Sequence, residues 1–513
     1  MTAEGHFDLL NSPLEGTNLI EASAGTGKTF TITGLFLRLV LEKDLSVDQI
    51  LVVTFTEAAT EELKGRIREK LKEAHEAFTG VGTEDPFLEA LAQKHADAHK
   101  AANALEQALH SFDQAAVSTI HGFCMRVLHE FAFESGDLFD TELVTDQEEL
   151  QRDVVADFWR KHFTTGTPLF VRYALGRGYS IDALLSLLSL KVLHPHLKVI
   201  PEVDTPGTSR QEAAFMGAFE DARTHWERSR DEVQKILTEH EDINRTRYPK
   251  KKIPEWIECM DGLMKAEIPD PQLFRDFEKF TSGNINASLK RHGIPPTHPF
   301  FDRCQTLKRR QEELIAVFER RLMALKSQLF HYAERILSEL KEEKNIHSFD
   351  DLLLKLHKAL LGRGGEDLQR AIREKFRAAL IDEFQDTDPV QYAIFKRIFG
   401  SRDSILFLVG DPKQAIYSFR GADIFTYMEA ARDVATRYDL KENWRSDPLL
   451  IKAINALFSQ NDLPFVYDEI PYRPTAPAQV SDRDSLRLDG KEGYPFQIWF
   501  LDAGTVSYTH LRA

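Results

Sequence analysis

Short apolar runs alternate with amphipathic helical patterns in the first part of the chain. The runs at 18–22 and 50–55 predict buried strands, and the segment 30–41 between them has helical spacing. Amphipathic helices are predicted to follow at 57–78 and within 85–112. This alternation is typical of a parallel sheet that carries helices on both faces.

The character of the chain changes between residues 146 and 345, which are mostly helical, charged and irregular in pattern. Pro-rich segments interrupt this region at 194–206, 249–254 and 295–299. Residues 303–343 contain neither Pro nor Gly, and their apolar positions follow three-to-four spacing. We therefore expect a long helix with one buried stripe.

Strand and helix patterns alternate again after residue 345. Residues 379–381 and 404–409 predict strands, and residues 389–399 between them predict a helix. The simplest account is one α/β core that is interrupted by a large, mostly helical insertion. At 513 residues, the chain is long enough for more than one domain.

Net charge, the length of the apolar stretches and the cysteine spacing limit the functional classes to which this chain can belong. The formal net charge of −16 gives no general support to nucleic-acid binding, so any DNA contact is expected in a lined groove or through a basic partner. No apolar stretch reaches the roughly 18 residues of a membrane span, and Met1–His6 lacks signal-peptide features. Cys124, Cys259 and Cys304 form neither a metal pattern nor a disulfide framework, which predicts a cytoplasmic protein.

Residues 21–29 read Glu-Ala-Ser-Ala-Gly-Thr-Gly-Lys-Thr, where a predicted strand turns into a helix. This is a P-loop pattern, in which glycines let backbone N–H groups surround phosphates. Lys28 is expected to reach the β and γ phosphates of ATP, and the Thr29 hydroxyl to ligate Mg²⁺. The predicted nucleotide-binding residues are Ala22, Ser23, Ala24, Gly25, Thr26, Gly27, Lys28 and Thr29. Ala22 replaces the usual first glycine, and a chance glycine-rich turn is the alternative.

A second segment supports the same chemistry. The apolar run 378–381 ends in Asp382 and Glu383, so both acids are expected at the carboxyl end of a strand. Asp382 is the predicted Mg²⁺ contact, and Glu383 is predicted to polarise the attacking water. Adjacent acids that are merely solvated are the alternative. We expect folding to bring Lys28 within a few ångströms of this pair.

Further motifs join strand ends or helix starts to hydroxyl, aromatic and basic side chains. They are Thr54-Phe55-Thr56, Ser118–Phe123, Gly410–Asp423 and Glu442–Ser446. Such side chains suit a groove in which bases stack on rings while hydroxyl and N–H groups hold phosphates.

In this order, the motifs resemble those of the superfamily-one DNA helicases of the UvrD type. The sequences at 21–32, 349–353 and 407–427 resemble those of the RecB family in particular. The resemblance extends over roughly residues 10–470. It implies RecA-like, P-loop NTPase domains with a parallel sheet and helices on both faces. The expected domains are 1–145 and 346–440 (the two parts of the ATP-binding domain), 146–345 (the helical insertion) and 441–513 (the start of a second RecA-like domain).

The resemblance also implies residue roles. Gln414 is expected to sense the γ-phosphate, Arg445 to act as an arginine finger, and Trp444 to stack on adenine. The residues expected to contact DNA are Thr54, Phe55, Thr56, His121, Tyr417, Phe419 and Arg420. The alternatives are a core or surface role for His121, and core packing for Trp444 and Phe419.

The function implied by the resemblance is that of an ATP-dependent 3′→5′ DNA helicase or translocase in double-strand-break repair and recombination. The expected partners are single-stranded DNA, duplex ends, and RecC- and RecD-like subunits of an exodeoxyribonuclease V complex, with no membrane. A P-loop ATPase that serves as a regulatory or structural subunit without autonomous unwinding is the alternative. A decayed, non-catalytic paralogue is disfavoured because the key lysine, acids, glutamine and arginine are all present.

Two departures from the family pattern qualify these expectations. Glu15 stands near the position where UvrD-type proteins carry an adenine-reading Gln. After Arg445 we find no later helicase motif and no nuclease motif, and Tyr508–Ala513 continues no pattern. We therefore expect this chain to correspond to an N-terminal portion that binds Mg·ATP weakly and does not unwind DNA alone.

The insertion carries a basic segment. Arg245, Arg247 and Lys250–Lys252 bracket Tyr248, and Trp256 follows closely. Basic groups interleaved with aromatic rings are typical of DNA contacts, here with duplex ahead of the fork. A solvated basic loop between acidic helices is the alternative.

Overall fold

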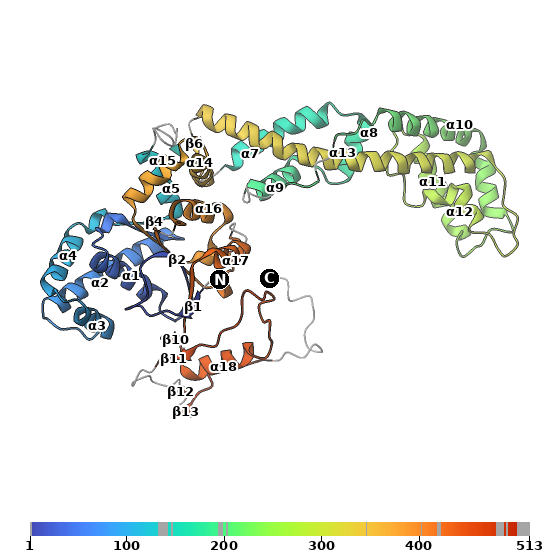
Figure 1. Ribbon diagram of the computed structural model, residues 1–513. Coiled ribbons are helices and arrows are strands. Elements are labelled where there is room, and N and C mark those ends of the chain that lie inside the picture. The colour runs from blue at the N-terminus through green and yellow to red at the C-terminus, as the bar shows by residue number, and fades with distance from the viewer. Residues whose placement is uncertain are drawn as a thin grey trace. The chain divides into compact units, whose positions relative to one another are not determined.

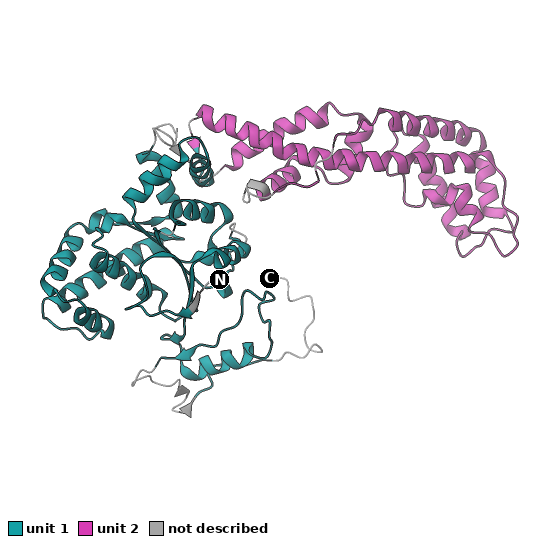
Figure 2. Cartoon of the chain, in the orientation of Figure 1, with its two compact units in different colours: residues 1–143, 347–513 teal, residues 144–346 magenta. Residues whose placement is uncertain are grey.

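The computed structural model describes residues 3–131, 142–144, 147–192, 198–201, 204–344, 346–401, 403–417, 422–478, 487–488 and 491–499. The chain divides into two compact units (Figure 2). Unit 1 comprises residues 1–143 and 347–513, and unit 2 comprises residues 144–346.

Unit 1 is built on a seven-stranded parallel sheet with the strand order β1-β9-β2-β8-β7-β3-β4 (Figure 1). In that order the strands are Ala3–His6, Thr436–Leu440, Gly16–Ala22, Ile405–Gly410, Ala378–Ile381, Ile50–Thr54 and Ala116–Thr119. Parallel neighbours need crossover connections, which helices provide here. The predicted α/β fold is confirmed.

Helices cover both faces of the sheet because successive strand residues point to opposite sides. On one face, strand residues such as Val52 and Phe407 pack on α1 (Lys28–Glu42), α2 (Glu57–Phe78), α3 (Pro86–Lys94) and α4 (Ala98–His110). On the other face, Val53 and Leu408 pack on the remaining helices of the sheet domain. These are α5 (Ile120–Glu130), α14 (Phe349–Leu361), α15 (Gly365–Lys375), α16 (Pro389–Phe399) and α17 (Ile424–Asp433).

Two strands of the seven-stranded sheet were not predicted. β1 and β9 read Ala-Glu-Gly-His and Thr-Arg-Tyr-Asp-Leu, which contain no continuous apolar run. β9 forms backbone pairs with β2, and β1 then pairs with β9 at the edge of the sheet. Their strand conformation comes from this pairing and not from local apolar pattern.

The remaining elements of unit 1 are short, apart from α18 (Pro448–Phe458). The 3₁₀ segments are η1 (Val47–Gln49), η2 (Phe112–Gln114), η6 (Phe384–Asp386) and η7 (Pro412–Gln414). The small strands are β5 (Glu142–Leu143), β10 (Glu442–Asn443), β11 (Ala476–Pro477), β12 (Arg487–Leu488) and β13 (Lys491–Glu492), and β6 (Ile346–His347) lies at the unit boundary.

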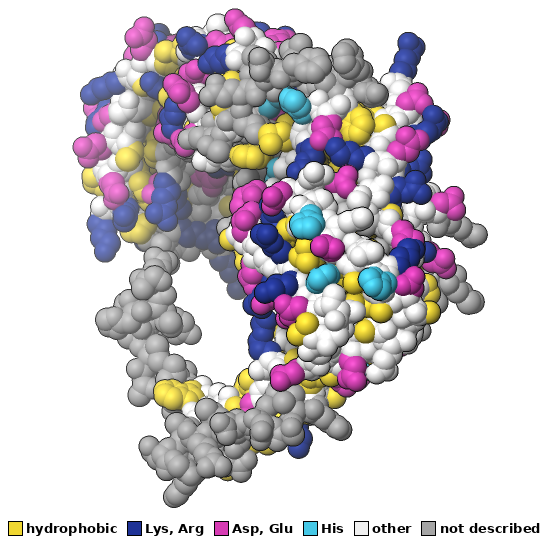
Figure 3. All heavy atoms as spheres, turned by 90° about the vertical axis from the view of Figure 1, so that its left-hand side faces the viewer, with side chains coloured by type: hydrophobic (Ala, Val, Ile, Leu, Met, Phe, Trp, Pro, Cys, Tyr) yellow, Lys and Arg dark blue, Asp and Glu magenta, His cyan; other side chains and the backbone are white. Residues whose placement is uncertain are grey.

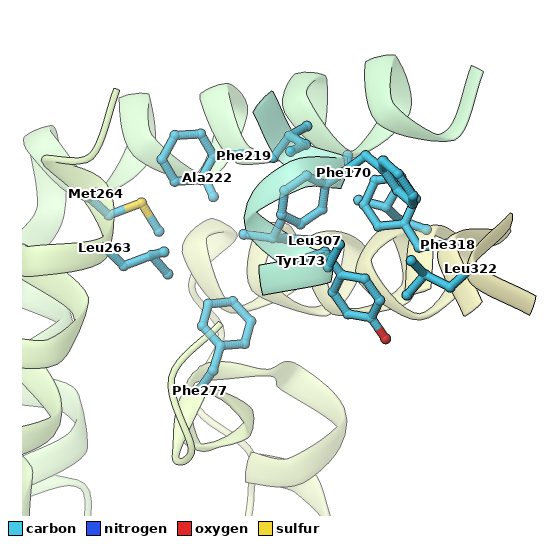
Figure 4. Close-up of a cluster of buried hydrophobic side chains, with 14 of the residues drawn as sticks. Phe170, Tyr173, Phe219, Ala222, Leu263, Met264, Phe277, Leu307, Phe318 and Leu322 are labelled. Atoms are coloured by element: carbon cyan, nitrogen blue, oxygen red, sulfur yellow. The ribbon is translucent and has the colours of Figure 1, made fainter. Parts of the chain in front are cut away.

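Unit 2 is helical and has its own core. Its helices are α7 (Glu148–Trp159), α8 (Pro168–Gly176), α9 (Ile181–Val192), α10 (Ser209–Glu239), α11 (Ile253–Met264), α12 (Ser282–Asn286) and α13 (Pro299–Lys344), with η3 (Arg160–Thr164), η4 (Lys250–Lys252) and η5 (Phe277–Phe280). The long helix α13 confirms the prediction for 303–343. Its buried stripe, which includes Leu307, Phe318 and Leu322, packs on Phe170 and Phe219 (Figure 4).

The structure corrects the interpretation of the basic segment. Tyr248 and Trp256 are 0% and 4% exposed, and their ring centroids lie 5.6 Å apart in an edge-to-face pair. The Tyr248 hydroxyl donates to the Asn284 side chain at 2.9 Å. Both rings belong to the core of unit 2, so they cannot stack on bases, whereas the side chains of Lys250–Lys252 are exposed.

No helix in the described part of the chain is both long and apolar enough to cross a membrane. The longest, α13, carries charged side chains on its outward positions.

Candidate active site

The site forms where three neighbouring strands end. β8 lies between β2 and β7, and Glu21 is in register with Gly410 while Ile381 is in register with Leu408. Because the strands are parallel, their carboxyl ends share one edge of the sheet. This places the P-loop, the acid pair and the segment after β8 side by side.

The P-loop joins β2 to α1. Ala22 is the buried last residue of β2, and the Ser23 carbonyl accepts bonds from the Thr26 N–H at 3.1 Å and hydroxyl at 2.8 Å. Gly25 and Gly27 have φ angles of 79° and 95°, the left-handed region that favours glycine. The predicted strand–loop–helix arrangement is therefore present.

The start of α1 is suited to an anion. Gly27 is its N-cap and offers no side-chain hydrogen bond, and the first turn contains no acidic residue. By contrast, side chains cap α2, α5 and α16 through Thr56, Thr119 and Asp388. The N–H groups and positive dipole end of α1 therefore meet no competing side-chain oxygen from the cap.

The structure brings Lys28 and the acid pair together. Lys28 Nζ lies 2.6 Å from Glu383 Oε2, although the residues are far apart in sequence. The Asp382 N–H donates to the Val53 carbonyl at 2.8 Å, and the Glu383 N–H donates to Asp382 Oδ1 at 2.9 Å. Glu383 adopts a left-handed φ of 50°, which is unusual for a non-glycine residue and turns the chain sharply after β7.

Burial changes the acidity of this site. Burial, aided by the neighbouring Glu383 charge, raises the pKa of Asp382 to about 6. The same two causes raise the pKa of Asp386 to about 6. A cation or a hydrogen-bond donor near these groups would favour their ionised forms.

Mg²⁺ fits this site only if it keeps ligands from water and phosphate. The described residues contain no cluster of three acidic, His or Cys side chains that could hold a metal alone. Mg²⁺ is commonly held by one or two carboxylates plus water and substrate phosphates. Thr29 is exposed in the first turn of α1, and the roles expected of Asp382 and Thr29 toward Mg²⁺ stay predictions.

A segment that begins at β10 is bound to the P-loop. Asn443 Nδ2 donates to the Ala24 carbonyl at 2.9 Å, and the Trp444 N–H donates to the Gly25 carbonyl at 2.8 Å. Asn443 Oδ1 accepts from the N–H groups of Arg445 at 3.0 Å and Ser446 at 2.9 Å. The motif pattern alone did not identify Asn443 as a site residue. The signal that could have found it is the residue type, because Asn side chains often accept hydrogen bonds from backbone N–H groups two or three residues later.

The side chains of Trp444 and Arg445 point away from the core. Trp444 is 56% exposed, which excludes the core-aromatic alternative, and Arg445 is also exposed. Glu15, in the turn before β2, is exposed as well. The roles expected of these residues toward the nucleotide stay predictions.

A cavity of about 300 Å³ lies beside this segment. Ser23, Ala24, Lys413 and Asn443 line one side, and apolar side chains of α18 line another. Lys28, Asp382 and Glu383 do not line it, so the cavity is separate from the position where the phosphate chemistry is expected.

Gln414 lies near the acids but bonds to another carboxylate. Its Nε2 donates to Asp411 Oδ2 at 2.7 Å, and Lys413 Nζ lies 2.8 Å from Asp411 Oδ1. The buried Gln385 connects this group to Glu383. Sequence analysis did not select Asp411 or Gln385.

The residues predicted to contact DNA follow β3, β4 and β8. Phe55 and Tyr417 are half-buried and stacked, with ring centroids 5.8 Å apart and planes 20° apart. Thr56 is exposed and caps α2. Thr54 does not reach the surface: it is 2% exposed, and its hydroxyl lies 2.6 Å from the Thr60 hydroxyl. The Thr54 hydroxyl therefore stabilises the turn between β3 and α2 and is not available to DNA, which corrects the prediction for this residue.

His121 lies in the first turn of α5. Its ring meets the 40% exposed ring of Phe349 edge-on, with centroids 5.4 Å apart, and burial lowers its pKa. The neutral ring is therefore favoured near pH 7. Sequence analysis did not propose Phe349 as a site residue, while Phe419 and Arg420 lie outside the described residues.

Acidic and basic side chains are interspersed on the face of the molecule in Figure 3. A broad basic field is not visible on that face.

Gly25→Ala is expected to disturb the P-loop. An added Cβ would lie 2.7 Å from Arg445 Cβ and 2.9 Å from Asn443 Oδ1, and the left-handed backbone adds about 1–2 kcal/mol of strain. We expect a lower melting temperature and faster hydrogen exchange in residues 442–446. Gly65→Ala is the control, because a Cβ there meets nothing within 4 Å. Unchanged exchange in Gly25→Ala would contradict the packing described.

Asp382→Asn is expected to change the pH dependence of stability. The folded protein holds the Asp382 proton up to about pH 6, whereas an unfolded chain releases it near pH 4, at about its ordinary pKa. Between these pH values the folded state binds more protons than the unfolded state. The contribution of Asp382 to the free energy of unfolding therefore falls as the pH rises from about 4 to about 6 and stays low above that. Asp382→Asn should raise the free energy of unfolding by about 1–3 kcal/mol at pH 7 and change it little at pH 4.

Urea unfolding at both pH values measures this effect, with the exposed Asp403→Asn as the control. A pH-independent effect of Asp382→Asn would contradict the raised pKa.

Comparison with known proteins agrees with this geometry. A family model described as the UvrD/REP helicase N-terminal domain matches residues 7–435. Proteins named RecBCD enzyme subunit RecB are similar over most of the chain. The Escherichia coli (strain K12) protein is 38% identical, over 97% of this chain and 42% of its own length. The Haemophilus influenzae protein is 34% identical over 97% and 44%, and a Mycobacterium tuberculosis protein is 29% identical over 88% and 30%.

The chain thus spans less than half the length of these relatives. The family match covers most of the chain, including β2, β3, β4, β7 and β8 of the sheet, whereas β1 and β9 lie just outside the matched residues. The chain belongs to the UvrD/REP helicase family, as a RecB-like member.

Proposed function

We propose that this chain is the nucleotide-binding part of an ATP-dependent DNA helicase or translocase of the RecB type. The observation that carries the proposal is the 2.6 Å contact between Lys28 Nζ and Glu383 Oε2 at the edge where β2, β8 and β7 end. A P-loop lysine beside a strand-end acid pair is the arrangement that binds and hydrolyses a nucleoside triphosphate.

In the proposed reaction, the backbone N–H groups of the P-loop and the start of α1 bind the ATP phosphates. Lys28 leaves Glu383 and turns to the β and γ phosphates. The freed carboxylate of Glu383 then orients a water molecule and accepts its proton. The water oxygen bonds to the γ-phosphorus as the bond from that phosphorus to the oxygen of the leaving diphosphate breaks.

The other site residues have supporting roles in this proposal. Asp382 and Thr29 would hold Mg²⁺ together with phosphate and water, and the ion would supply positive charge to the phosphate oxygens. Gln414 senses the γ-phosphate, Arg445 adds positive charge to the transition state, and Trp444 stacks on adenine.

DNA is proposed to bind along the ends of β3 and β4. Phe55, Thr56, His121 and Tyr417 offer rings and a hydroxyl there, and the exposed ring of Phe349 extends the set. The segment 411–417 begins at Asp411 beside the acids and ends at Tyr417 beside Phe55. A change in that segment on loss of the γ-phosphate would therefore move a DNA contact.

We further propose, from the resemblance to RecB, that the complete protein moves 3′→5′ along DNA. Its proposed setting is the cytoplasm, in double-strand-break repair and recombination. Its proposed partners are single-stranded DNA, duplex ends and subunits that resemble RecC and RecD.

Glu383→Gln in the complete gene product tests the site. Removing the proton acceptor is expected to lower ATP turnover at least about 100-fold, while a fluorescent ATP analogue should still bind. Lys28→Ala should weaken both binding and turnover, because the phosphate loses its cation. The measurements are ATP hydrolysis with and without single-stranded DNA, and strand displacement on duplexes with 3′ or 5′ overhangs.

Glu374→Gln and Lys43→Ala, at exposed positions of α15 and the end of α1, are the matched controls. Wild-type turnover in Glu383→Gln would overturn the proposed site. Turnover that DNA does not stimulate would favour instead a P-loop ATPase subunit without autonomous unwinding.

The exposed lysines of η4 test the proposed duplex contact of unit 2. Replacing Lys250, Lys251 and Lys252 with Ala should flatten the dependence of duplex affinity on log[salt] by up to about 0.9 per lysine. A triple replacement of Lys235, Lys265 and Lys344, which are exposed but scattered, removes the same charge and is the control. Equal slopes in the two triple variants would exclude a local contact at η4.

A further inference from the structure

One buried amide joins the acid pair to the segment after β8. Gln385, in η6, is 2% exposed. Its Nε2 donates to Glu383 Oε2 at 2.8 Å, and its Oε1 accepts from the Asp411 N–H at 2.9 Å. A single side chain therefore bonds to the ends of two neighbouring strands, β7 and β8.

The bonds continue on both sides of Gln385. Glu383 Oε2 also contacts Lys28 Nζ at 2.6 Å. Asp411, itself 2% exposed, accepts from Gln414 Nε2 at 2.7 Å. A continuous series of polar contacts thus runs from the P-loop lysine, through Glu383 and Gln385, to Asp411 and Gln414.

The position of this amide is tightly constrained. A Cβ on Gly410 would lie 2.6 Å from Gln385 Oε1 and 3.1 Å from the backbone nitrogens of Gln385 and Phe384. The absence of a side chain at Gly410 is what lets η6 approach the end of β8 so closely. The amide is also within 3.3 Å of Asp386 Oδ2, so its second N–H has an acceptor.

The chemistry of the site gives this amide a specific task. While Lys28 contacts Glu383, the carboxylate has two donors. Lys28 and Gln385 are the two side-chain donors to Glu383 Oε2 among the described residues. When Lys28 turns to the phosphates, Gln385 still donates to this carboxylate. A fixed carboxylate favours proton acceptance because misplacement of a reacting group by about 1 Å can cost about 100-fold in rate.

We propose that Gln385 is a positioning residue: it orients the Glu383 carboxylate toward the attacking water and ties it to the Asp411–Gln414 segment. The inference rests on the proposed function. It predicts that Gln385 affects the chemical step and not the binding of ATP, since its side-chain hydrogen bonds within the described residues go to Glu383, Asp386 and Asp411 and not to the P-loop backbone.

Two variants of the complete gene product separate this role from simple packing. Gln385→Met keeps the approximate size but removes both bonds, and we expect kcat for DNA-stimulated ATP hydrolysis to fall about 10- to 100-fold with KM changed less than about threefold. Gln385→Glu keeps the shape but donates only when the introduced carboxyl is protonated. Its kcat, relative to that of the wild type at the same pH, should fall as the pH rises through the titration of that carboxyl.

Gln311→Met is the matched control. Gln311 is a buried glutamine of unit 2, 3% exposed, whose amide donates to the carbonyls of Pro271 and Gln272. Its replacement removes comparable bonds away from the acid pair, so kcat and the pH profile of hydrolysis should stay those of the wild type.

The Glu383 and Gln385 variants together distinguish the proposed function from the positioning role. If Glu383→Gln retains wild-type turnover, the proposed function fails. If Glu383→Gln is inactive while Gln385→Met retains wild-type kcat, or Gln385→Glu follows the wild-type pH profile, only the positioning role is overturned. A fall in kcat for Gln385→Met, together with the altered pH profile of Gln385→Glu, supports it.

Discussion

The contact between Lys28 and Glu383 depends on a constraint of the whole sheet. Parallel strands place all their carboxyl ends at one edge, and the order β2-β8-β7 makes the P-loop and the acid pair near neighbours. Most of the sequence separates β2 from β7 and β8, including all of unit 2. The site therefore exists only when the later strands join the sheet beside the first ones. Its chemistry is a product of topology as much as of residue type.

The same edge imposes opposing demands on charge. Burial raises the pKa of Asp382 and of Asp386, which stores an electrostatic cost in the folded protein. Lys28 offsets part of that cost by contacting Glu383, and the uncapped start of α1 adds a positive dipole. A metal-bound nucleotide would supply the remaining positive charge to the acids while satisfying the start of α1. The uncapped start of α1 and the buried acids therefore suit the proposed ligand, which carries both phosphate and a cation.

Close backbone approach holds the surrounding segments in place. Asn443 and Trp444 bond to P-loop carbonyls, and Gly25 leaves the room for them. Gly410 does the same for Gln385 at the end of β8. These contacts hold the exposed Trp444 and Arg445 beside the P-loop and connect the acids to Gln414. Unit 2, by contrast, uses its aromatic residues for its own core and presents lysines at η4 to solvent.

The sequence by itself determined the α/β class, the long helix of the insertion, and the P-loop and acid pair, because apolar periodicity and glycine-rich turns are local signals. It missed β1 and β9, whose conformation comes from pairing with β2 and with each other. It also could not tell that Thr54, Tyr248 and Trp256 are buried, since a hydroxyl or ring has the same local pattern in a core as in a groove. Only the tertiary structure decided the contacts of Asn443 with Ala24 and of Gln385 with Asp411, because these partners are separated in the chain and meet only when the strands assemble.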